Sequence, residues 1–266
     1  MFADLAAPLY ALVATGFGVG LTVGLTGVGG GSLMTPALIF GFGIPPHIAV
    51  GTDLLFAAAT KAAGSAELAR SRRIDWRIVL ALSAGSIPAA LLTLWVISQV
   101  GGGSKEAHSA IKSVLGAALL LTAAATAVKV IRGSQQQRLA DINAPIPKNR
   151  HVVAALVGAL IGAMVSLTSV GAGAIGVSAL LLIYPMIATQ RIVAADIAYA
   201  VPLTLIAGLG HASLGHVDWN LLAALLIGSL PGIWLGTRLS HKTPERALRG
   251  LLTIPLTWAG FKLLLA

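Results

Sequence analysis

Two glycine-rich segments carry the groups best placed to bind a ligand. They span residues 26–32 and 168–174, and both interrupt long apolar stretches. Because clustered glycines break a helix, the N–H groups that begin the next helix point into the break with partial positive charge. Such a helix end binds anions without a cationic side chain. The predicted substrate-binding residues of the two segments are Thr26, Gly27, Gly29, Gly30, Gly31, Ser32, Thr168, Ser169, Gly171 and Gly173.

Lys61 and two aspartates could complete an anion site. Lys61 lies nine residues before Arg70, about 13 Å from the end of its helix, which is beyond the comfortable reach of a snorkelling ammonium. An anionic substrate would offset the cost of a cation at that depth. The alternative is a structural partner, with Asp196 of the other half better placed than Asp53. The two aspartates are either helix caps or proton-coupling carboxylates.

Other glycines and polar residues have structural explanations. Gly16, Gly20 and Gly24 follow the small-residue spacing of packed membrane helices, so we assign them to packing. The remaining polar residues lie near predicted helix ends. Membrane-interface positions are expected for Glu67, His211 and His216, and a turn with a cap and an interfacial tryptophan for Asp75-Trp76 and Asp218-Trp219.

Composition identifies a membrane protein that spans the bilayer several times. Hydrophobic residues make up 56% of the chain and charged residues only 10%, where a soluble domain has about a quarter charged residues. The net charge of +9 is spread over loops between apolar spans, which argues against nucleic acid as a partner. Cysteine is absent, and no metal-ligand or nucleophile–base pattern is found. We therefore expect no metal, no cofactor and no catalytic residues, and a lipid bilayer as the surroundings.

The chain is predicted to contain two copies of one unit. Thr26 and Thr168 lie 142 residues apart, and Asp53 and Asp196 lie 143 apart. The units are residues 1–132 and 151–266, joined by a polar linker at 133–150. Each begins with a broken apolar segment, at about 6–41 and 151–185. Three helices follow in each unit, at about 47–69, 77–99 and 108–131, and at about 191–211, 219–239 and 246–265.

Loop charges predict how the units lie in the membrane. A broken segment could cross once with a kink, or form a hairpin that returns to its own side. The hairpin puts 14 of the 18 lysines and arginines in cytoplasmic loops, whereas single crossings give a split of about 10 to 7. A hairpin followed by three spans inverts the second unit. The linker is then cytoplasmic and both termini are external.

The first unit carries a motif seen in a known family. Its residues are Gly20, Gly24, Gly27, Gly29, Gly30, Gly31, Pro36, Gly51, Thr52 and Leu54. This pattern resembles the TauE/SafE family of sulfite and organosulfonate exporters, and the second unit repeats much of it. The resemblance implies secondary transport of small sulfur-containing anions, such as sulfite, sulfoacetate or other organosulfonates, across a bacterial inner membrane.

These lines together predict an all-helical inverted-repeat transporter. The amides of the two breaks and Lys61 would bind the anion, and one repeat would rock against the other to alternate access. Proton coupling through Asp53 or Asp196 is a further hypothesis. A passive anion channel and a membrane-embedded enzyme or scaffold are the alternatives.

Overall fold

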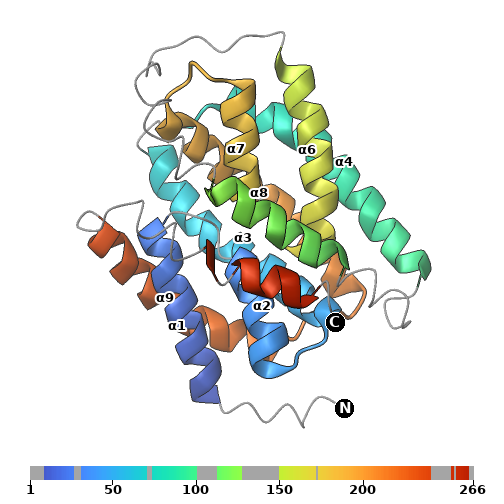
Figure 1. Cartoon of the computed structure of the whole chain (residues 1–266), viewed down its shortest axis with the longest axis vertical. Coiled ribbons are helices and arrows are strands. Elements are labelled where there is room, and N and C mark those ends of the chain that lie inside the picture. Colours follow the sequence, from blue (N-terminus) through green and yellow to red (C-terminus); the bar gives the residue numbers. More distant parts are fainter. Residues whose placement is uncertain are drawn as a thin grey trace.

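The protein is all-helical in the part of the chain that the structure describes. A computed structural model describes residues 9–26, 31–70, 74–100, 113–127, 150–171, 173–240, 253–254 and 256–263, and none of these forms a strand. The helices are α1 (Leu9–Thr26), α2 (Gly31–Phe42), α3 (Pro46–Arg70), α4 (Trp76–Val100), α6 (His151–Thr168), α7 (Ala174–Ile183), α8 (Thr189–Ser213) and α9 (Trp219–Ser240) (Figure 1). Residues 113–127 and 256–263 are also helical.

Four of these helices are long and apolar enough to cross a bilayer. The stretches are Trp76–Gln99, His151–Thr168, Thr189–Ser213 and Trp219–Leu239, and about 20 apolar residues suffice for a span. The predicted multi-pass membrane fold is thereby confirmed. The predicted linker at 133–150 lies, except for Arg150, outside the described residues.

The second predicted helix break separates a long helix from a short one, and residues 27–30 of the first break, between α1 and α2, lie outside the described residues. The second break lies between α6 and α7, where Ser169, Gly171 and Gly173 have φ angles of 58°, 127° and 147°. Glycine adopts such positive angles at little cost. The helices that follow the breaks, α2 and α7, have only 12 and 10 residues, about 18 and 15 Å, and so cover only part of a bilayer.

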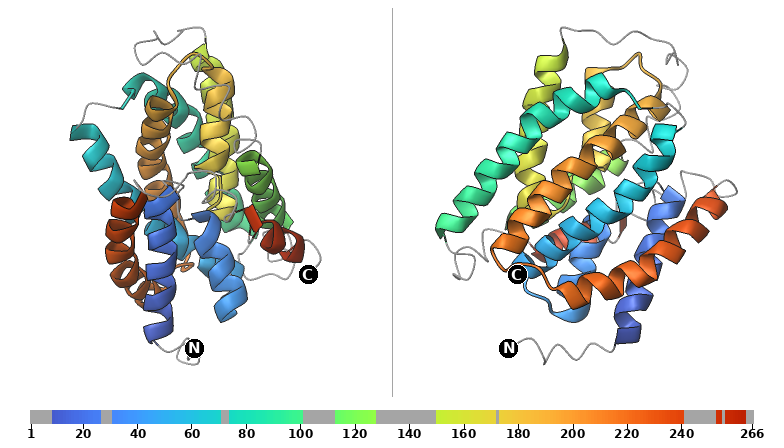
Figure 2. Two further views of the ribbon diagram at one scale, coloured as in Figure 1. Left: turned by 60° about the vertical axis from the view of Figure 1, so that its left-hand side comes forward. Right: turned by 180° about the vertical axis from the view of Figure 1, so that it is seen from behind.

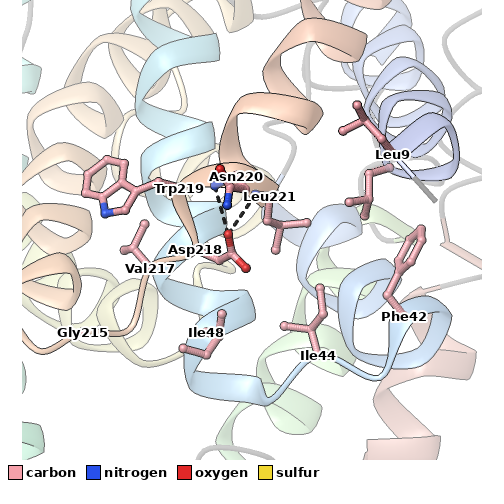
Figure 3. A pocket seen from close by; sticks show the side chains of 11 residues that line it. Leu9, Phe42, Ile44, Ile48, Gly215, Val217, Asp218, Trp219, Asn220 and Leu221 are labelled. Atoms are coloured by element: carbon pink, nitrogen blue, oxygen red, sulfur yellow. Dashed lines mark hydrogen bonds between the residues drawn. The ribbon is translucent and has the colours of Figure 1, made fainter. Parts of the chain in front are cut away.

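Each broken segment folds back on itself as a hairpin. The Arg150 guanidinium, at the start of α6, donates to the Ile183 carbonyl at the end of α7. In the first unit, Leu9 at the start of α1 lines the same hollow as Phe42 at the end of α2 (Figure 3). The two ends of each segment therefore meet, as the hairpin prediction requires and a single kinked crossing does not allow.

The longest helices form one tilted layer. In the right-hand view of Figure 2, α4, α8, α3 and α9 lie side by side in that order, which agrees with their packing partners. The outer members of the layer each pack on a hairpin of the other unit, with α6 against α4 and α1 against α9. The central pair, α3 and α8, brings the two units together in the middle of the molecule.

Glycines allow close contacts between the two units, and the same contact occurs twice with the roles of the units exchanged. A Cβ at Gly20 would overlap the Ser229 carbonyl oxygen and lie 2.7 Å from its Cα, and a Cβ at Gly162 would overlap the Ser86 carbonyl oxygen and lie 2.6 Å from its Cα. These two contacts join equivalent positions of the two units with their roles exchanged. Matching close approaches occur for Gly16 on Leu225, Gly158 on Leu82 and Gly24 on Ile233. The predicted packing role of Gly16, Gly20 and Gly24 is confirmed.

Candidate functional site

Asp53 lies at the centre of the molecule, where α3 meets α2 and the second break. Its side chain is fully buried, and its Oδ2 accepts a hydrogen bond of 2.5 Å from the Thr35 hydroxyl of α2. The Ser169 hydroxyl lies close to the same carboxylate without a well-formed hydrogen bond. Among the described residues, neither Oδ1 of Asp53 nor the Ser169 hydroxyl has a hydrogen-bond partner. Two polar atoms are thus buried together without full satisfaction.

Asp196 occupies the equivalent place in the second unit. It is buried in α8, and its Oδ1 lies against the backbone of Gly176 in the first turn of α7. Any side chain at position 176 would overlap this oxygen, so glycine makes room for the carboxylate. Each aspartate therefore meets the short helix of its own unit, Asp53 at α2 and Asp196 at α7.

The helix-cap explanation for the two aspartates is wrong. Asp53 lies in the second turn of α3 and bonds to a different helix. Asp196 lies in the second turn of α8, whose N-cap is Ala188 without a side-chain bond. Neither side chain can therefore satisfy the first amides of its own helix.

Lys61 is buried between these two carboxylates. Only 7% of it is exposed, and it interacts electrostatically with both aspartates, more strongly with Asp196 than with Asp53. The cost of placing a cation in the membrane is therefore offset inside the protein, by partners from both units. One lysine and two carboxylates share the same buried space.

Tyr199 lies in the same buried cluster as Lys61 and the two aspartates, although it was not among the predicted site residues. It follows Asp196 by one turn of α8, is fully buried and interacts electrostatically with that carboxylate. Its hydroxyl lies 3.6 Å from the point where a Cβ of Gly176 would be, and has no hydrogen-bond partner within the described part of the chain. A tyrosine at a position where the first unit has Phe56 was the available sequence signal.

The second break supplies amides at the start of α7. Gly176 and Val177 donate their N–H groups to the carbonyls of Gly171 and Gly173. The N–H groups of Gly171, Gly173 and Ile175 donate to no described carbonyl. Since Tyr199 lies against the same turn, these amides and its hydroxyl line one side of the cluster. A helix start that carries partial positive charge and donors without a carbonyl partner in the described part of the chain is suited to an anion.

The other predicted binding residues have mixed positions. Thr168 donates to the Met164 carbonyl at 2.7 Å and accepts from the Val170 amide at 3.1 Å, so its hydroxyl holds the shape of the break. In the first break, Gly27, Gly29 and Gly30 lie outside the described residues. The backbones of Thr26, Gly31 and Ser32 belong to helices α1 and α2, and their side chains lie outside the description.

Two hollows among the described residues lie away from this cluster. One of about 450 Å³ is lined mostly by apolar side chains from the start of α1, the end of α2 and the start of α3 (Figure 3). The start of α9 also lines it, with the polar residues Asp218 and Asn220. Asp218 accepts hydrogen bonds from the amides of Asn220 and Leu221, as the predicted helix cap. An apolar hollow without a cation does not suit an anion, so we place the candidate site at Lys61.

A family model now decides the identity. The model described as "Sulfite exporter TauE/SafE" matches residues 12–263. The chain belongs to the TauE/SafE family. It is also similar to the "Probable membrane transporter protein YjnA" of Bacillus subtilis, with 37% identity over 258 residues, 95% of this chain and 98% of the relative. A "Probable membrane transporter protein" of Xylella fastidiosa is 26% identical over 88% of this chain and 85% of its own length. No solved structure matches significantly.

TauE/SafE membership makes this protein a membrane transporter and not an enzyme, as predicted. No group of three or more histidine, cysteine or acidic side chains among the residues that the structure describes could hold a metal ion. The candidate site of this TauE/SafE protein consists of the buried lysine, aspartates and tyrosine on α3 and α8.

Two features at the ends of this transporter differ from the predictions. His211 and His216 are buried, with 2% and 8% exposed, instead of lying at the membrane interface. Their Nδ1 atoms are 3.3 Å apart, and the His211 Nε2–H donates to the Ser166 carbonyl in the last turn of α6. The break leaves carbonyl groups at the end of α6 without backbone partners, and the buried His211 donates to one of them.

The second difference is an ion pair at Asp75. Its carboxylate accepts two hydrogen bonds from Arg191, of 2.7 and 2.9 Å, and so joins the loop before α4 to the first turn of α8. The prediction for Asp75 was a turn and a helix cap, without this partner on α8. The neighbouring Trp76, like Trp219, is more than half exposed, as expected for a membrane-interface residue.

Proposed function

We propose that this TauE/SafE transporter exports small sulfur-containing anions, such as sulfite, sulfoacetate or other organosulfonates, across a bacterial inner membrane. One observation carries the proposal: the buried cation Lys61 belongs to the same cluster as the buried Ser169 and Tyr199 hydroxyls, which can donate to an anion and have no hydrogen-bond partner among the described residues. Leaving such an atom unpaired costs about 1–3 kcal/mol. A bound polar ligand would satisfy several of them at once.

A sulfonate or sulfite group matches the donors of this site. Its oxygens are compact acceptors that carry one or two negative charges. Lys61 would supply the opposite charge, and the amides of Gly171 and Gly173, with Ser169, would supply hydrogen bonds. The first break, at residues 26–32, would contribute the corresponding donors from the other unit. A helix start that binds an anionic substrate near the bilayer midplane is a recurring plan in transporters.

Proton coupling follows from the charges around Lys61. With both aspartates ionised, the cluster already carries one more negative than positive charge, and an incoming anion would be repelled. Protonating Asp53 or Asp196 removes that excess and frees Lys61 to pair with the substrate. We therefore propose that proton and anion bind together and cross in the same direction, without net charge movement for a monovalent anion.

Alternating access would come from rocking of the two units, residues 1–132 and 151–266, against one another. The reciprocal glycine contacts of α1 with α9 and of α6 with α4 support a two-fold relation between them. The loop charges support its inverted form, with the linker 133–150 cytoplasmic and both termini external. In that arrangement the two breaks approach the centre from opposite faces.

Transport by purified protein in liposomes tests the function. The wild type should accelerate counterflow of labelled sulfite into vesicles loaded with unlabelled sulfite or methanesulfonate. Carriers show such counterflow, whereas a passive channel does not. Wild-type vesicles without any saturable sulfur-anion flux would refute the proposed substrate class.

Substitution of Lys61→Met tests the binding role within the same assay. Methionine keeps the apolar stem and removes the charge, so the apparent KM for sulfite should rise by about tenfold or more. The matched control is Lys262→Met, since Lys262 is exposed and lies over the rings of Phe40 and Trp258. An unchanged KM in Lys61→Met would exclude direct contact with the anion.

A further inference from the structure

The two units present different side chains to the shared site. Asp53 and Asp196 are equivalent, but three residues later the first unit has Phe56 and the second Tyr199. Eight residues after the aspartate, the first unit has Lys61 and the second Thr204. Thr204 satisfies its hydroxyl on the Ala200 carbonyl of its own helix at 2.8 Å. The first unit thus supplies the cation and the second a phenol.

The hydroxyl of Tyr199 is buried without a hydrogen-bond partner among the residues that the structure describes. Buried tyrosines normally form a hydrogen bond through this group. Here the side chain is completely buried, and within the described residues the hydroxyl has no partner. It lies beside Gly176 in the first turn of α7, where the amides of Gly173 and Ile175 have no carbonyl partner among the described residues. Asp196 Oδ1 fills the space that a Cβ at position 176 would take, and the Tyr199 hydroxyl lies 3.6 Å from the same point.

We infer that Tyr199 donates a hydrogen bond to the transported anion and sets its selectivity for tetrahedral oxyanions. The inference rests on the proposed function. Lys61 on α3, the first amides of α7 and the Tyr199 hydroxyl approach the anion from different elements. A pyramidal group with three oxygens can accept a hydrogen bond from each of these three groups, whereas a planar carboxylate has only two oxygens. A site with a buried donor rejects ligands that leave this donor unpaired.

Binding of methanesulfonate and acetate to the purified transporter measures this selectivity. Both probes are small monovalent anions with one methyl group, so they differ mainly in the shape of the charged group. Calorimetric titration of the wild type should show a preference for methanesulfonate. In Tyr199→Phe, the Kd for methanesulfonate should rise by about tenfold, the loss expected for one hydrogen bond to a charged group. The Kd for acetate should change much less.

Tyr184→Phe is the matched control. Tyr184 is also fully buried in the second unit, but its hydroxyl lies 3.4 Å from His151 Nδ1, at the end of the hairpin. Its loss should leave both affinities unchanged. Because the Tyr199 hydroxyl has no described partner without ligand, Tyr199→Phe should also melt at the wild-type temperature. A lowered melting temperature with unchanged selectivity would show a purely structural role.

The possible failures are distinguishable. A wild type that binds neither sulfite nor methanesulfonate would overturn the proposed function, and this inference with it. A wild type that prefers methanesulfonate, with Tyr199→Phe showing the same preference or an equal loss for both anions, would overturn the role of Tyr199 alone.

Discussion

The close approach of α1 to α9 makes Gly20 a sensitive position. In Gly20→Ala, the new methyl group would overlap the Ser229 carbonyl oxygen and lie 2.7 Å from its Cα and 3.0 Å from its carbonyl carbon. Unstrained contacts between non-bonded carbons lie at about 3.5–4.0 Å, so the helices must separate by about 1 Å. The obstacle is backbone, which cannot rotate away. Such overpacking costs about 1–3 kcal/mol, and sometimes more.

Gly18→Ala provides the matched comparison on the same helix. No atom lies within 4 Å of a Cβ at this position, so only the helix propensity of alanine remains, a gain of up to about 1 kcal/mol. The same propensity gain applies at Gly20 and cancels, so the two variants should differ by the overpacking cost of about 1–3 kcal/mol in stability. For a protein of this size, that corresponds to about 2–12 °C in melting temperature.

Thermal unfolding in detergent, followed by circular dichroism and by recovery of the monodisperse peak in gel filtration, measures the difference. Gly162→Ala should behave like Gly20→Ala, because its methyl group meets the Ser86 carbonyl in the same way. Equal melting temperatures for Gly20→Ala and Gly18→Ala would refute the reasoning, since no close packing of α1 on α9 could then exist.

Two further predictions concern charged groups. Arg191→Gln and Asp75→Asn should each lower the melting temperature by a few degrees, because each loses the same part-buried ion pair. The double variant should lose no more than the worse single variant, and additive losses would show that the pair does not act as a unit. The control is Arg238→Gln, since Arg238 is exposed and lies over the ring of Trp234. Asp53→Asn, which can still accept from Thr35, should make counterflow of methanesulfonate, a monoanion throughout this range, insensitive to pH between mildly acidic and mildly alkaline conditions; a pH profile unchanged from wild type would exclude Asp53 as the coupling group.

Much of the architecture could be predicted from the sequence, because the glycines repeated in both units mark where a helix breaks or packs closely. A glycine run breaks a helix wherever it occurs, and the spacing of Gly16, Gly20 and Gly24 fixes a packing face within one helix. Lys61 could be singled out by its distance from the helix end alone. These arguments need only local geometry, and the structure agrees with them.

The missed features depend on how separate helices meet. The bond from Thr35 to Asp53 and the approach of Tyr199 to Gly176 are set by the register between helices, which no spacing in the sequence reports. Arg191 and Asp75 are 116 residues apart. His211 was misplaced because a position near a helix end does not reveal whether the end of another helix covers it.

The exchange of hairpins between the two units has a consequence for how the site could arise. A chain with only the first unit would leave the glycine faces of α1 and α4 uncovered. Two copies facing one another could supply the missing contacts. Such a pair of identical chains would carry the same residue on both sides. Joining the copies in one polypeptide removes that constraint, so that Lys61 can stand opposite Thr204, and Tyr199 opposite Phe56. Under the proposed function, the covalent link would allow a symmetric scaffold to hold its substrate in one orientation.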